Sequence, residues 1–144
     1  MSSALDRLKN LTAKISSYEL SRKENMKVLK ALFETLHIDN KVTEFHDLFD
    51  FKAINLSGMS LAADTLGEVK EGKYIQVIAI TYDKTSEVKN KNISLAYFGR
   101  AENVDPQLRE KIITFVLRWR FEKSFMTLEH YHTMLESLKP KADA

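Results

Sequence analysis

The chain has 144 residues, of which 44% are hydrophobic and 29% are charged, and its formal net charge is +2. These values favour one packed domain over residues 1–144 and not a disordered chain. The absence of cysteine excludes disulfide scaffolds, cysteine nucleophiles and thiolate metal sites. No signal-peptide core follows the first residues, and no apolar run reaches the roughly 18 residues of a membrane span. We therefore expect a cytoplasmic protein that makes no use of a membrane.

Two amphipathic segments open the chain. Ser3 is placed to cap a first helix. The apolar stripe of this helix comprises Leu8, Leu11, Ile15 and Tyr18. Ser21 and Glu24 have the spacing of a capping box, which predicts a second helix that runs to about His37. We therefore expect an N-terminal helical hairpin with its turn near residues 16–17 or 19–20.

The strand signals lie in the middle of the chain. Alternating apolar and charged residues predict one strand near residues 48–56, and a short second one is expected near 60–69. Residues 73–82 are apolar on both faces, which predicts a central strand covered on both sides. Residues 92–99 are its expected antiparallel partner, and the polar loop 83–91 between them is expected to be exposed and mobile.

The C-terminal third is again helical in pattern. Asp105 and Pro106 predict the start of a third helix, and a fourth is expected near residues 127–138. The tail, residues 139–144, is expected to be frayed. Grouped strands that do not alternate with helices predict the α+β class. The expected order is an N-terminal helical hairpin, a central antiparallel sheet of about three to five strands, and two C-terminal helices.

The surroundings of the single tryptophan are the strongest candidate for a binding surface. Arg118, Trp119, Arg120 and Phe121 follow an apolar run, and Arg and Trp are the residues that most often anchor protein interfaces. Trp119 also continues the helical stripe of Phe115, which is typical of a core residue. The sequence leaves both alternatives open. Stacking on a nucleobase is a third alternative for the same residues.

A second candidate surface is the basic N-terminal segment, because residues 1–31 carry seven Lys or Arg against three Asp or Glu. Within it, Lys14, Arg22, Lys23 and Lys27 are candidates for binding phosphate groups or an acidic protein. The acidic stretch 34–71 would offset this charge in front of a polyanion. Nucleic-acid binding is therefore the alternative and not the leading hypothesis.

Signals for catalysis and for metal binding are weak. The densest cluster of titratable groups comprises Glu44, His46, Asp47 and Asp50. An acidic, solvated turn explains this cluster equally well. His130 and His132 are two residues apart, and on a helix they point in opposed directions, so one metal ion cannot use both. Nucleophile elbows, phosphate-binding glycine loops and dinucleotide fingerprints are missing from the sequence. We therefore expect no cofactor and no metal.

These observations lead to one functional hypothesis and two alternatives. The leading hypothesis is a non-enzymatic interaction module, namely an adaptor, inhibitor or accessory subunit that binds another protein. The first alternative is a nucleic-acid-associated accessory protein that uses the basic N-terminal helices. The second, less favoured, is a small enzyme with its site near residues 44–50. The helices are also amphipathic enough to form a homodimer.

Overall fold

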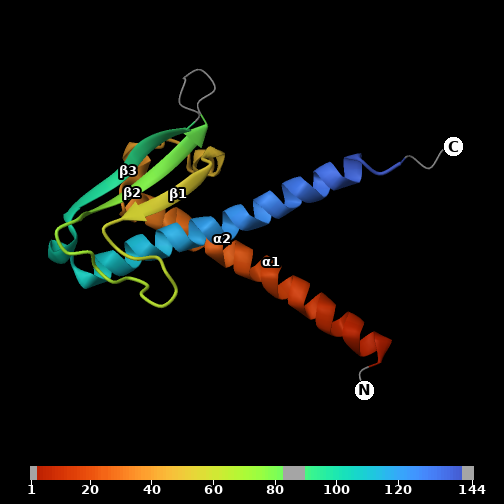
Figure 1. Cartoon of the computed structure of the whole chain (residues 1–144). Coiled ribbons are helices and arrows are strands. Elements are labelled where there is room, and N and C mark those ends of the chain that lie inside the picture. Colours follow the sequence, from red (N-terminus) through yellow and green to blue (C-terminus); the bar gives the residue numbers. More distant parts are fainter. Residues whose placement is uncertain (1–2, 83–89, 141–144) are drawn as a thin grey trace.

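The computed structural model describes residues 3–82 and 90–140. This part of the chain combines two long helices with a three-stranded sheet, which confirms the predicted α+β class (Figure 1). The elements are α1 (Ala4–Thr35), β1 (Ala53–Ser57), β2 (Tyr74–Tyr82), β3 (Asn90–Arg100) and α2 (Pro106–Ser137). Short 3-10 helices connect them at Ile38–Asn40, Phe45–Asp50 and Ala101–Asn103.

Helix α1 is continuous over 32 residues. The cap predicted at Ser3 is confirmed, because the Ser3 hydroxyl accepts a hydrogen bond from the Asp6 backbone N–H at 3.0 Å. Both predicted N-terminal segments are helical, but the turn expected at residues 16–20 is absent, so the hairpin is wrong. The helix contains no glycine or proline, and serines and a capping-box pair can also occupy a helix interior.

Helix α2 also runs for 32 residues. The Asp105 carboxylate caps it by accepting from the Gln107 backbone N–H at 3.0 Å, and Pro106 lies in its first turn as predicted. The two expected C-terminal helices are one helix, because no glycine or proline interrupts residues 107–139. The frayed tail was expected at residues 139–144, most of which lie outside the described residues.

The sheet has the order β1-β2-β3, and β2 pairs antiparallel with both neighbours. The predicted pairing of residues 73–82 with residues 92–99 is confirmed. Most of the loop predicted at 83–91 lies outside the described residues, and its last two residues, Asn90 and Lys91, begin strand β3. Strand β3 therefore begins at Asn90, earlier than the start predicted at residue 92.

The sheet is fully covered on one face only. Ile75, Val77 and Ala79 of β2 are buried against the helices, which lie beneath the sheet (Figure 1). The side chains that alternate with them stay half-buried, including Ile78 and Ile80. The prediction that both faces are covered is therefore wrong, because no second helical layer packs on the outer face in the described part of the chain.

The segment between α1 and β2 differs from the prediction at both of its expected strands. The first strand is shorter than residues 48–56, because Phe45–Asp50 forms a 3-10 helix that buries Leu48 and Phe49 before β1 begins. Residues 60–69 form a loop and not a strand. A bridge between Met59 and Val69 closes the loop, together with backbone hydrogen bonds such as that from the Ser60 N–H to the Glu68 carbonyl at 2.9 Å. Two side chains of the 3-10 helix thus enter the core without any sheet pairing.

One hydrophobic core lies between the inner face of the sheet and the crossing region of the two helices. Each long helix contributes only part of its length to this core. The largest fully buried side chains include Leu29, Leu48, Ile54, Ile75, Leu95, Ile112 and Phe115. Among the side chains that the structure describes, those in the N-terminal part of α1 and in the C-terminal part of α2 are not buried.

Candidate protein-binding surface

Two helical arms project from the body of the molecule and diverge from each other (Figure 1). We define the α1 arm as residues 4–21 and the α2 arm as residues 127–137. Every side chain described in these two ranges is exposed. No helix in the described part of the chain is long and apolar enough to cross a membrane. The described side chains of both arms thus face solvent, and their contacts with the rest of the chain include Tyr18 with Phe125 and Glu129 with Arg22, close to the body.

The α1 arm extends an apolar stripe that is buried closer to the body. Residues of this stripe are spaced alternately by three and four, the repeat of a coiled-coil seam. We call it the α1 seam; its described members are Leu8, Leu11, Tyr18, Arg22, Asn25, Leu29, Leu32 and Leu36. Leu29 and Leu36 are buried, whereas Leu8 is 58% exposed and Leu11 is 55% exposed. One helix face thus passes from core to solvent, apolar at both ends and interrupted at the crossing by Arg22 and Asn25.

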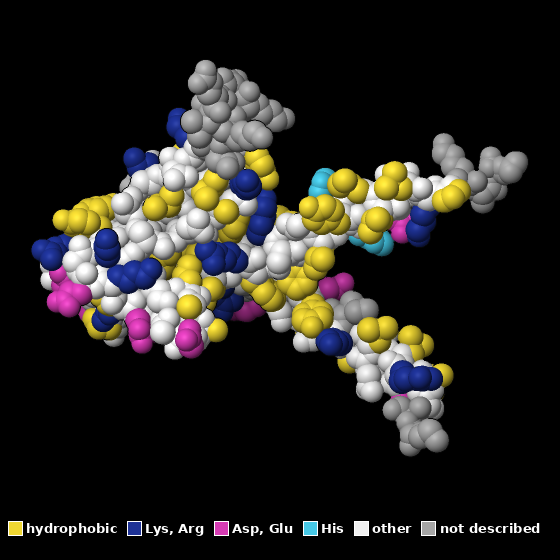
Figure 2. Space-filling model, in the orientation of Figure 1, with side chains coloured by type: hydrophobic (Ala, Val, Ile, Leu, Met, Phe, Trp, Pro, Cys, Tyr) yellow, Lys and Arg dark blue, Asp and Glu magenta, His cyan; other side chains and the backbone are white. Residues whose placement is uncertain are grey.

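Helix α2 carries a second seam with the same spacing. We call it the α2 seam; it comprises Leu117, Phe121, Ser124, Leu128, Tyr131, Leu135 and Leu138. Exposure rises along it, from 37% at Leu117 to 65% at Leu128 and 78% at Leu138. The core-facing stripe of α2, which includes Phe115 and Trp119, follows a different side of the helix. Figure 2 shows apolar side chains along both arms.

A polar cluster fixes the point where α1 and α2 cross. The Arg22 guanidinium donates to Glu122 at 2.7 Å and also binds Glu129. Glu122 is only 3% exposed. Its hydrogen bond is the largest cause that raises the pKa of Arg22 above the ordinary value. Beside it, the buried Asn25 amide donates to the Arg118 carbonyl at 2.9 Å. The cluster sets the directions in which the two arms leave the body.

The four residues predicted around the tryptophan do not form one surface. The indole N–H of Trp119 donates to the Leu48 carbonyl at 2.8 Å, and its ring is 2% exposed. The guanidinium of Arg118 donates to the Asn25 side chain at 3.2 Å. The guanidinium of Arg120 donates to the Ile54 carbonyl of strand β1 at 3.2 Å.

Phe121 is the member of that group that lies on an exposed apolar surface. It is 38% exposed, belongs to the α2 seam and packs edge-on against Phe125 at 5.0 Å between ring centroids. Of the two alternatives for Trp119, the geometry places it in the core, where its ring stacks parallel to Phe49. A binding role for the group stays a prediction; Trp119 is buried, whereas Phe121 and Arg118 both line the same surface groove.

The basic residues predicted on the N-terminal segment also point in different directions. Lys14 and Lys23 are nine residues apart, which places them on opposite sides of a helix with 100° per residue. Lys23 and Lys27 share a side and are exposed. Arg22 is occupied by Glu122 and Glu129. The structure therefore brings together two of the four predicted phosphate-binding residues.

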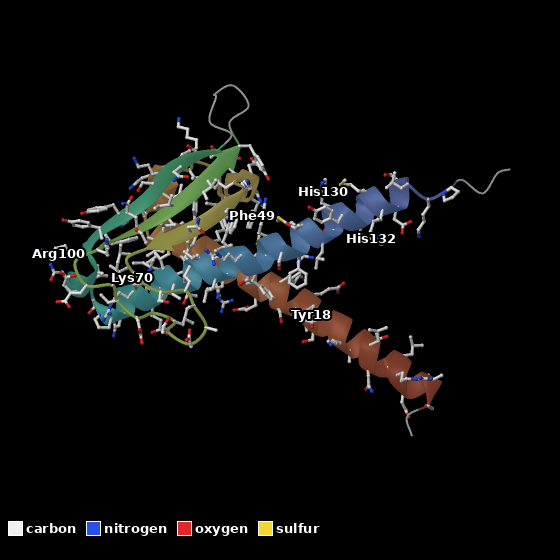
Figure 3. All side chains as sticks on the ribbon, viewed as in Figure 1. Tyr18, Phe49, Lys70, Arg100, His130 and His132 are labelled. Atoms are coloured by element: carbon white, nitrogen blue, oxygen red, sulfur yellow. The ribbon has the colours of Figure 1, made fainter. Side chains whose placement is uncertain are left out.

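The cluster proposed for catalysis lies on the surface around the 3-10 helix Phe45–Asp50. Its four members, Glu44, His46, Asp47 and Asp50, are all exposed. His130 and His132 lie on opposite sides of α2, as Figure 3 shows. In the part of the chain that the structure describes, no three His, Asp or Glu side chains gather in a group that could hold a metal ion.

A groove on the body continues the α2 seam toward the base of the helix. It has a volume of about 530 Å³ and is lined by Ser21, Glu24, Asn25, Thr114, Leu117, Arg118 and Phe121. Leu117 and Phe121 belong to the α2 seam, while Ser21 and Glu24 of α1 form the opposite wall. A helix lying along the α2 seam would therefore meet α1 at this groove.

Sequence reasoning missed both seams as surfaces. It read Leu8 and Leu11 as the stripe of a short helix, and it allowed a homodimer through amphipathic helices without identifying which residues would form it. The spacing of three and four over three heptads, from Leu117 to Leu138, was the signal that could have identified a coiled-coil seam. The predicted breaks in both helices hid that repeat.

Comparison of the chain with models of protein families, with curated proteins and with solved structures finds no match. The function of this chain is therefore inferred from its own residues.

Proposed function

We propose that the protein is a non-enzymatic interaction module of the cytoplasm, an adaptor, inhibitor or accessory subunit that binds another protein through its α1 arm. One observation carries this proposal. Leu8, Leu11 and Tyr18 are exposed, although they continue the helix face that is buried at Leu29 and Leu36. The same face that packs the core is thus presented to solvent.

Exposure of this face has a free-energy cost that a partner would remove. Burying one large apolar side chain contributes about 1.5–3 kcal/mol relative to leaving it in water. In proteins, most of the stability of a helix comes from packing its apolar face and not from intrinsic helix propensity. In the α1 arm, residues 4–21, the Tyr18 ring lies 6.1 Å from the Phe125 ring between centroids, but every described side chain of the arm remains exposed.

The spacing of the seam indicates the chemistry of the partner. Heptad seams pack against other heptad seams by inserting each apolar side chain between four residues of the facing helix. The partner is therefore a protein that offers an amphipathic helix to the α1 seam. The basic residues of α1 do not form one surface, because Lys14 lies opposite Lys23 and Arg22 is paired with Glu122. This arrangement supports a protein partner over a nucleic acid.

The test compares two double variants of the α1 arm that add equal charge. Leu8→Lys with Leu11→Lys places two lysines on the seam, and Asn10→Lys with Ala13→Lys places two on the opposite side of the helix. Each variant and the wild type are immobilised and exposed to a nuclease-treated lysate of the source cells. We expect one protein to be captured by the wild type and the control, and lost with the seam variant.

The partner is then identified by mass spectrometry, and its binding is repeated with purified protein. Equal capture by both variants would contradict the role of the α1 seam. The wild type is also exposed to an untreated lysate. Capture from the untreated lysate that is lost from the nuclease-treated one would favour the nucleic-acid alternative instead.

A further inference from the structure

We propose that the α2 seam binds the α2 seam of a second copy of this chain in an antiparallel helix pair. This inference rests on the proposed function, in that both treat the exposed seams as binding surfaces. It assigns a different surface and a different occupant. The α1 arms would stay free for the other protein, and the α2 arms would join the two copies.

The first argument is length and continuity. The α2 seam extends from Leu117 to Leu138, which is about 32 Å at 1.5 Å per residue. Its apolar members beyond the body are Leu128, Tyr131, Leu135 and Leu138, and all are more than half exposed. The seam does not stop where the arm begins but continues onto the body through Phe121 and Leu117. An occupant must therefore be a helix long enough to cover both parts.

The second argument is orientation. The base of the α2 seam forms a groove whose other wall is α1, at Ser21 and Glu24. On a further side of the helix, Arg120 binds the Ile54 carbonyl of β1. Because these walls flank the base of the seam, we infer that a projecting helix end, and not the body of another copy, occupies it. The α2 arm is such a bare end, because residues 127–137 are exposed all round. When the tip of one α2 helix packs on the base of the α2 seam of the other copy, the two helices run antiparallel.

The third argument is that the seam is complementary to itself when it is reversed. In an antiparallel pair, two residues face each other when they lie at equal distances on either side of the two-fold axis. An axis at the level of residue 126 satisfies this condition for three pairs at once. The pairs are Leu117 with Leu135, Phe121 with Tyr131, and Ser124 with Leu128 of the second copy. The small Ser124 leaves room near the axis, and the aromatic rings lie together on either side.

The mass of the protein in solution gives the first test. Light scattering of the wild type should give twice the chain mass of 16.6 kDa. Leu135→Lys should reduce the mass to that of one chain, because it places a charge in the seam. Thr133→Lys, about 160° away around the helix, is the matched control and should keep the double mass. Circular dichroism of all three should show the same folded body.

Engineered disulfides test the orientation, and the chain suits this test because it contains no cysteine of its own. Leu117→Cys and Leu135→Cys are prepared separately and then mixed under a mild oxidant. The mixture should form a disulfide-linked dimer. Each variant alone should not, because its two cysteines would lie about 27 Å apart at 1.5 Å per residue. A mixture of Leu117→Cys with Thr133→Cys is the negative control.

Each outcome separates this inference from the proposed function. Disulfide formation by Leu117→Cys alone and by Leu135→Cys alone, as fast as in their mixture, would show a parallel pair and overturn the antiparallel one. A wild-type mass of one chain at every concentration would overturn the dimer. Neither result would alter capture by the α1 arm, which the Leu8 and Leu11 variants measure independently.

Discussion

At the scale of single residues, the crossing of the two helices depends on a carboxylate that is almost completely buried. Glu122 is compensated by Arg22, whose side chain is partly open to solvent. A buried charge without its partner is costly, whereas an exposed ion pair contributes little. The crossing is therefore held mainly by the free-energy cost of leaving the buried Glu122 carboxylate without a partner. The attraction between Arg22 and Glu122 contributes less.

Arg22→Ala should lower the free energy of unfolding by about 1–3 kcal/mol, the range for leaving a buried polar group without its hydrogen-bond partner. Lys23→Ala removes a neighbouring exposed cation and should change the free energy of unfolding by no more than about 0.5 kcal/mol. Urea unfolding followed by circular dichroism measures both variants. Equal stabilities would show that the pair does not hold the crossing.

Trp119→Ala should destabilise the protein by about 3–5 kcal/mol, because it removes a large side chain from the core. Trp119→Phe keeps most of the packing and loses the hydrogen bond to Leu48, so its loss should be smaller. The midpoints of thermal unfolding rank the three proteins. A Trp119→Ala protein as stable as the wild type, with binding lost, would instead identify Trp119 as an interface residue.

At the scale of elements, the sequence predicts the features that depend on residues close together in the chain, namely helix caps and the central strands. The caps at Ser3 and Asp105 were identified because each residue type satisfies free N–H groups at a helix start. Strand β2 was identified because a short apolar run between turn residues is typical of a buried strand. The pairing of β2 with β3 followed from their proximity in the chain.

The sequence predicted two helix breaks that the structure does not contain. Serines at 16, 17 and 21 favour caps when a helix ends, but nothing in residues 14–24 prevents a helix from continuing. The wrong breaks had a consequence for the candidate site. They divided each long seam into short stripes. A short apolar stripe indicates that one face of a helix is packed against something, but it does not indicate whether that is the same chain or another protein.

Strand β2 should contain the slowest-exchanging amides of the chain, because it pairs on both sides and buries Ile75, Val77 and Ala79. Hydrogen exchange followed by NMR measures these rates. Amides in residues 75–80 should exchange only on global unfolding. Exchange there as fast as in the exposed α1 arm would contradict the central position of the strand.

At the scale of the whole molecule, we propose that the two seams bind different partners. An antiparallel pair of α2 helices would join two bodies and carry two α1 arms outward, one from each copy. Two linked binding sites can raise the strength of attachment to a partner with two sites well beyond that of one site. The protein would then be a dimer that presents two copies of one helical binding surface.

The central claim is that the arms are incomplete surfaces which association covers. Hydrogen exchange measured by mass spectrometry over a dilution series tests it most directly. Peptides from residues 128–138 should be protected at high protein concentration and lose that protection on dilution, while residues 75–80 stay protected throughout. Peptides from residues 4–14 should stay unprotected at every concentration until the captured partner is added. Protection of residues 128–138 that does not change on dilution, in a protein with the mass of one chain, would contradict the claim.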